Sequence, residues 1–97
     1  MAAETTYTPE DIKARLARDL PQWSFEDGHI KRRYKTSKWP ETLMFLNAVG
    51  YLAEQADHHP DLAASYASLE VKLMTHSAGG ITDKDLDLAI KIEALAP

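Results

Sequence analysis

The spacing of apolar residues changes four times along this chain, and this change of period constrains the fold more than any other feature. Buried faces repeat every three to four residues in helices and every two in half-buried strands. A helical period runs from Thr8-Pro9, a typical helix start, to Leu20. Residues 22–36 then alternate around an Asp27-Gly28 turn, which predicts a β-hairpin.

The second half of the chain repeats this order. The predicted elements are a helix over Pro40–Asp57, a hairpin over Asp61–Tyr66 and Leu69–Thr75, and a helix that opens at Thr82. Two hairpins can form one sheet, so the sequence predicts an α+β fold of order α-ββ-α-ββ-α. We expect a four-stranded antiparallel sheet with helices packed on one face, and one domain over residues 1–97.

The composition excludes several classes of protein. There is no cysteine, which rules out disulfides and thiolate sites. No apolar run approaches the roughly 18 residues that span a bilayer, so we expect no membrane partner. The first 13 residues lack the basic-then-apolar order of a signal peptide, which predicts a cytoplasmic protein.

A basic cluster lies in the first half of the chain, with no acid inside it: Lys31, Arg32, Arg33, Lys35 and Lys38. Such a patch can attract phosphates or other anions. It also fits the solvated face of a strand and the loop that follows. The net charge is −4, without the basic excess of a nucleic-acid binder, so we favour the solvated face and expect no nucleic-acid partner.

Three of the four histidines lie where predicted elements end. His58 and His59 follow the long helix, and His76 follows the last strand. If the hairpins pair centrally, these ends meet at one rim of the sheet. Histidine exchanges protons near neutral pH, although a histidine at a helix C-terminus can also simply complement the helix dipole. Adjacent histidine side chains diverge and no two histidines show i,i+4 spacing, so no metal is expected.

Three further candidates also have ordinary structural interpretations. Glu54 fits an exposed helix position, and Asp85 fits the third residue of a capping box that begins at Thr82. Gly79-Gly80 is too short to cradle a diphosphate, but backbone amides before a helix N-terminus can hold an anionic or polar group.

Taken together, these residues form an ordered pattern: an acid, His-His-Pro, an aromatic residue, Thr-His, a glycine pair and a later acid. In this sequence they are Glu54, Asp57-His58-His59-Pro60, Tyr66, Thr75-His76, Gly79-Gly80-Ile81-Thr82 and Asp85. The pattern closely resembles the pterin-4a-carbinolamine dehydratase family. The resemblance extends over nearly the whole chain, and the family fold is the α-ββ-α-ββ-α arrangement expected above.

The resemblance implies a hydro-lyase. The family removes water from a 4a-hydroxytetrahydropterin, such as 4a-hydroxytetrahydrobiopterin, to give the quinonoid dihydropterin that is recycled for aromatic amino acid hydroxylases. The pterin is the substrate, so no cofactor is implied. By resemblance, the three active-site histidines are His58, His59 and His76, and the downstream acid is Asp85. The sequence does not settle which histidine plays which role; we favour His58 and His76 as the acid/base pair, and Asp85, if it reaches an imidazole, can fix its tautomer. The implied substrate-binding residues are His59, Glu54, Thr75 and Gly79.

The family also implies an alternative of another class, a non-catalytic interaction module. Some relatives act as transcriptional coactivators, and others resemble assembly factors. Relatives without the reaction tend to lose a histidine, and all three are present here, so we favour the enzyme. The resemblance also implies a homo-oligomer, a dimer or a tetramer built as a dimer of dimers. The small core of the chain and the wide apolar arc of its Pro40–Asp57 helix support this expectation. A hydroxylase of the same pathway is a candidate partner.

Overall fold

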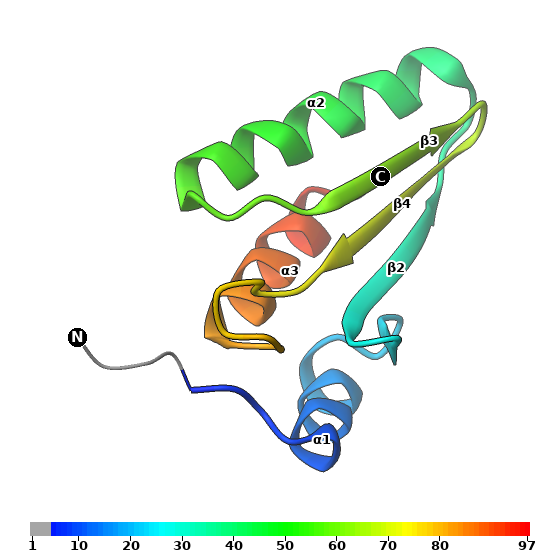
Figure 1. Ribbon diagram of the computed structural model, residues 1–97. Coiled ribbons are helices and arrows are strands. Elements are labelled where there is room, and N and C mark those ends of the chain that lie inside the picture. Colours follow the sequence, from blue (N-terminus) through cyan, green and yellow to red (C-terminus); the bar gives the residue numbers. More distant parts are fainter. Residues whose placement is uncertain (1–4) are drawn as a thin grey trace.

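The computed structural model describes residues 5–97, which form three helices and four strands (Figure 1). The elements are α1 (Pro9–Asp19), β1 (Ser24–Glu26), β2 (His29–Lys35), α2 (Trp39–Ala56), β3 (Asp61–Ser65), β4 (Ser68–Leu73) and α3 (Asp83–Leu95). This order confirms the predicted α-ββ-α-ββ-α arrangement. In the described part of the chain, no helix combines the length and the apolar character that crossing a bilayer requires.

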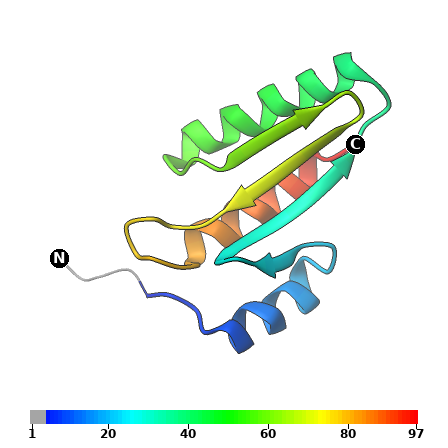
Figure 2. The ribbon, with the colours of Figure 1, turned by 45° about the vertical axis from the view of Figure 1, so that its right-hand side comes forward.

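The two hairpins join through their inner strands. The strand order is β1-β2-β4-β3 and every neighbouring pair is antiparallel. The register of β2 and β4 places Ile30 opposite Leu73 and Tyr34 opposite Leu69. Helices α2 and α3 cover the same face of this sheet (Figure 2). The predicted fold class is therefore confirmed.

The core lies between the sheet and these two helices. Alternate residues of β4 are fully buried, as a strand with one covered face requires. Helix α2 buries Phe45, Val49 and Ala53, which recur at helical spacing. Helix α1 lies at the β1 edge of the sheet (Figure 2) and adds Ile12 and Leu16 to the same core.

The end of α2 sets the backbone that leads into the first histidine. Asp57 has a left-handed conformation, with φ 49°, and its backbone N–H donates to Glu54. The N–H of His58 reaches back to the carbonyl of Ala53 at 3.1 Å. This pair of bonds is a Schellman cap, which ends the helix and turns the chain sharply. The helix spans Trp39–Ala56, one residue earlier at each end than predicted.

Arg32 corrects the expectation that the whole basic cluster faces solvent. It lies opposite Val71 in the register, on the covered face of the sheet, and its side chain is 19% exposed. Its guanidinium contacts the carboxylate of Glu93 on α3 and stacks over the Tyr34 ring, 4.2 Å from its centroid. Arg33, the next residue, is exposed. Strand alternation therefore places one cation of the cluster between the sheet and α3.

Glu93 is the centre of a polar cluster at this contact. Its Oε1 accepts hydrogen bonds from the Trp23 indole at 3.0 Å, from the Tyr34 hydroxyl at 2.7 Å and from Arg32. Burial alone would raise the pKa of Glu93, but the hydrogen bonds from Tyr34, Arg32 and Trp23 outweigh it and hold that pKa below its usual value. The cluster ties α3 to β2 and to the segment before β1.

Candidate active site

The three candidate histidines meet at one rim of the sheet. Antiparallel pairing puts the start of β3 and the end of β4 at the same end, and His58 and His59 precede β3 while His76 follows β4. All three line one open cavity of about 280 Å³, which we call the histidine cleft. Its lining is Asp57, His58, His59, Met74, Thr75, His76, Ser77 and Lys84.

His58 is paired with a buried carboxylate. Its Nε2 lies 2.6 Å from Oδ1 of Asp85, which is fully buried, while the His58 side chain is 10% exposed. A buried polar group is stabilised when it is hydrogen-bonded, and this contact supplies one of the hydrogen bonds of the Asp85 carboxyl group. With Nε2 engaged, Nδ1 is the ring nitrogen that can exchange a proton with a bound molecule.

The second carboxylate oxygen of Asp85, Oδ2, stabilises the start of α3. Oδ2 accepts the backbone N–H of Thr82 at 2.9 Å and the hydroxyl of Thr75 at 2.7 Å. The capping box of α3 is present, as the sequence predicts. Asp85 is therefore both a helix cap and the partner of an imidazole, because each of its two carboxylate oxygens has one of these roles.

His59 has a different environment. Its Nε2 lies 2.8 Å from Oε1 of Glu54, and the two side chains are 57% and 80% exposed. Glu54 lies in the last turn of α2 and does not itself line the cleft, so it contacts His59 at the exposed edge of the cleft. Exposed pairs of this kind contribute little to stability, and their main effect is to orient the ring.

The position of His76 depends on a short loop closed by Thr75. The backbone N–H of Thr75 donates to the carbonyl of Gly80 at 2.9 Å, and that of Gly79 donates back to Thr75 at 2.9 Å. These bonds hold residues 75–80 in a tight turn beyond β4. The His76 side chain is exposed, so it can exchange protons with solvent.

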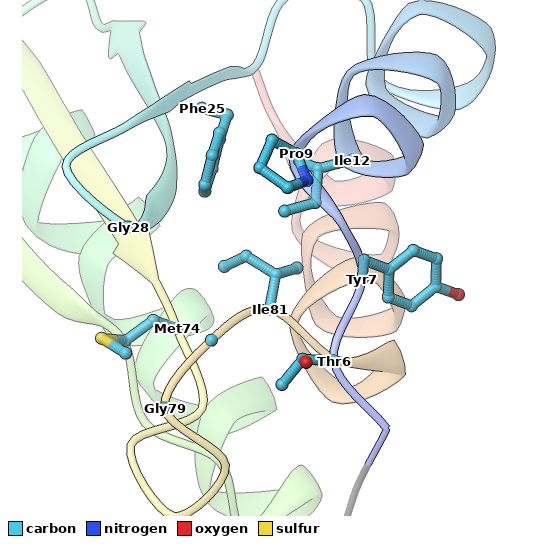
Figure 3. A pocket seen from close by; sticks show the side chains of 10 residues that line it. Thr6, Tyr7, Pro9, Ile12, Phe25, Gly28, Met74, Gly79 and Ile81 are labelled. Atoms are coloured by element: carbon cyan, nitrogen blue, oxygen red, sulfur yellow. The ribbon is translucent and has the colours of Figure 1, made fainter.

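Gly79 does not line the histidine cleft. It lines a second cavity of about 200 Å³, together with Thr6, Phe25 and Ile81 (Figure 3). Met74 lines both cavities. The resemblance assigned Gly79 to substrate binding, but Gly79 is absent from the lining of the histidine cleft, and its backbone N–H donates to the carbonyl of His76 at 3.2 Å.

Asp57, part of the His-His-Pro motif, also lines the cleft, whereas three cleft residues were not singled out by the sequence: Met74, Ser77 and Lys84. Ser77 is the chain neighbour of His76, and this adjacency was the available signal. Lys84 reaches the cleft because the first turn of α3 lies beside it, which only the fold reveals. Within residues 5–97, no three His, Asp or Glu side chains gather in an arrangement suited to one metal ion.

This chain is similar to known proteins over most of its length. A family model described as "Pterin 4 alpha carbinolamine dehydratase" matches residues 5–95. A relative from Picosynechococcus, named provisionally as a pterin-4-alpha-carbinolamine dehydratase, is 46% identical over 88% of this chain and 91% of its own length. A relative from Aquifex aeolicus with the same provisional name is 42% identical over 89% of this chain and 86% of its own.

Two solved structures share the fold. One is described as a transcriptional coactivator/pterin dehydratase from Brucella melitensis. It has a TM-score of 0.88 and 30% identity, and the match covers 96% of this chain and all of that one. The other is a pterin dehydratase-like protein described as a RuBisCO assembly factor in the alpha-carboxysome, with a TM-score of 0.63. At 19% identity over 76% of this chain and 86% of that one, it shows likeness of fold alone.

Proposed function

Because this chain belongs to the pterin 4 alpha carbinolamine dehydratase family, we propose that it is a hydro-lyase acting on a 4a-hydroxytetrahydropterin such as 4a-hydroxytetrahydrobiopterin. The product is the quinonoid dihydropterin. The observation that carries the proposal is the pair of His58 with buried Asp85, which opens onto the same cleft as His76.

The reaction needs one proton donor and one proton acceptor. The C4a–O bond breaks, and the oxygen must gain a proton as it departs because hydroxide is a poor leaving group. N5 loses its proton and a double bond forms between C4a and N5. The substrate gains one proton at the departing oxygen and loses one from N5. The proton donor and the proton acceptor then return to their starting protonation states by exchanging protons with solvent.

We assign the acceptor to His58. A carboxylate only accepts hydrogen bonds, so ionised Asp85 keeps the hydrogen of His58 on Nε2 and a lone pair on Nδ1. Nδ1 takes the proton from N5, and the charge of Asp85 stabilises the imidazolium that forms. No cofactor is used in this scheme.

We assign the donor to His76 and substrate orientation to His59. His76 lines the cleft and is exposed, so it can be recharged with a proton from solvent. His59, held by Glu54 at the surface, can hydrogen-bond a polar edge of the pterin. Both assignments follow from access to the cleft.

The test is the dehydration rate, per folded molecule, of a synthetic 4a-hydroxytetrahydropterin. The wild-type protein should accelerate it, and His58→Ala or His76→Ala should lower kcat by roughly 10²–10⁴-fold. His29→Ala is the matched control, because His29 begins β2 and does not line the cleft. Circular dichroism reports folding. Full turnover in both cleft variants would refute the acid/base assignment. An inactive wild type would refute the proposed enzymatic function.

A protein-interaction module is the second candidate function, and α2 is the observation that favours it. Trp39, Met44 and Tyr51 are 41%, 71% and 65% exposed, although each has a large apolar surface. Exposed apolar groups gathered on one element mark association sites. We propose a second copy of this chain as the partner, since a domain of 97 residues has a small core.

Sedimentation tests this association. The wild type should sediment as a dimer or tetramer at micromolar concentration, and Met44→Glu should shift it toward the monomer. A monomeric wild type would contradict the oligomer. Because the enzyme is also expected to be an oligomer, only the absence of dehydration would favour the interaction module over it.

A further inference from the structure

We propose that Thr75 and Thr82 are positioning residues of this site, whose hydroxyl groups hold Asp85 so that His58 keeps a single tautomer. The catalytic consequence rests on the proposed dehydration. The tautomer itself can be measured without a substrate, so the two ideas can fail separately.

These hydroxyls are buried behind the cleft. Thr75 is 2% exposed and Thr82 is 4% exposed, and both pack against fully buried Asp85. Although Thr75 lines the cleft, its hydroxyl is bonded to Asp85 at 2.7 Å and to Thr82 at 2.8 Å. A hydroxyl with two buried partners is poorly placed to bind a substrate. Its role is therefore to orient Asp85.

The hydrogen bonds can run in only one direction. Each hydroxyl has one hydrogen, and Thr75 donates its hydrogen to Oδ2 of Asp85. The contact between the two hydroxyls then requires Thr82 to donate to Thr75. The Thr82 oxygen in turn accepts the backbone N–H of Lys84 at 3.3 Å. The chain therefore begins at the first turn of α3 and ends on the carboxylate, and each bond polarises the next.

This chain determines which oxygen faces His58. Oδ2 is occupied by the Thr75 hydroxyl and the Thr82 backbone N–H, which leaves Oδ1 for the imidazole. With the carboxylate held in one orientation, the hydrogen of His58 stays on Nε2. Thr75 also closes the turn that carries His76. One buried threonine thus links the positions of both proposed proton-transfer groups.

The experiment compares Thr75→Val, which keeps the shape and removes the hydroxyl, with Thr75→Ser, which keeps the hydroxyl. The ¹⁵N chemical shifts of the His58 ring report the tautomer. We expect Nε2–H in the wild type and in Thr75→Ser, and a mixture of tautomers in Thr75→Val. In Thr75→Val, kcat should also fall about tenfold with KM little changed, because a hydrogen bond to a charged group is lost.

Thr42→Val is the matched control. Thr42 is also fully buried, and its hydroxyl donates to the Tyr66 carbonyl at 3.0 Å, away from the cleft. We expect it to lose stability as Thr75→Val does, while the His58 tautomer stays unchanged. If Thr75→Val does not fold, Thr82→Gly removes the upstream hydroxyl at a position where glycine is tolerated as an N-cap.

Three results would overturn the inference. They are Nδ1–H in the wild type, an unchanged tautomer in the folded hydroxyl-deletion variants, or the same tautomer mixture in Thr42→Val. An inactive wild type that shows the expected tautomer pattern would refute the proposed dehydration and leave the positioning role intact.

Discussion

Nε2 of His58 lies 2.6 Å from Oδ1 of Asp85, although the two residues are 27 positions apart in the sequence. The same carboxylate caps α3 through its other oxygen. One side chain therefore both stabilises the first turn of α3 and contacts the His58 ring. Changes at this carboxylate should therefore affect both stability and chemistry, and the two effects can be separated.

Asp85→Asn should lower kcat by roughly 10²-fold or more. If the amide oxygen stays with Thr75 and Thr82, the amide nitrogen faces His58 and donates to Nε2. The hydrogen of the ring then moves to Nδ1, which can no longer accept a proton. Steady-state kinetics per folded molecule measure the effect. Asp87→Asn, an exposed change two residues later in α3, is the control and should leave kcat unchanged.

His59→Ala should raise KM while leaving kcat within about a factor of ten, if His59 orients the substrate. Glu54→Gln should have a smaller effect in the same direction, because exposed ion pairs are weak and screened by salt. Kinetics at low and high salt measure both. A large fall in kcat with unchanged KM would instead place His59 among the proton-transfer groups.

Glu93 should make the stability of the protein depend on pH on the acid side. Its pKa is lower in the folded protein than in the unfolded chain, so its stabilising contribution is complete above the unfolded value of about 4.3. That contribution is lost as the pH falls through the folded value. The difference in unfolding free energy between wild type and Glu93→Gln should therefore be greatest near neutral pH and shrink in acid.

Urea unfolding at a series of pH values measures this difference. Asp87→Asn serves again as the control, since that carboxylate is exposed on the same helix. A constant difference between wild type and Glu93→Gln across the acid range would contradict the role assigned to the hydrogen bonds from Tyr34, Arg32 and Trp23.

Asp57→Ala should destabilise the protein by about 1 kcal/mol, and Asp57→Gly should destabilise it less. Asp57 has a positive φ, which costs an alanine energy and costs glycine none. At exposed Asn47, inside α2, the order should be reversed because glycine is the poorer helix former there. Thermal unfolding of the four variants measures both orders. If the alanine variant were the less stable of the two at both Asp57 and Asn47, the explanation from the positive φ of Asp57 would be refuted.

The sequence alone was sufficient for the local elements. The helix start at Thr8-Pro9, the Thr82 capping box and the second hairpin were all predicted, and the structure confirms them. Periodicity and capping depend on residues within a few positions of one another, so they can be interpreted before the chain is folded. The histidines could be identified as candidates for the same reason, since each follows the end of a predicted element.

Only the tertiary structure decided which of these residues meet. The pairing of β3 with β4 brings the three histidines to one cleft, and the first turn of α3 brings Asp85 to His58 and Lys84 to the rim. The packing also leaves Gly79 in the lining of the second cavity and places Arg32 against Glu93. These contacts join residues far apart in the chain. Their geometry depends on how the elements pack, which no local pattern of residues encodes.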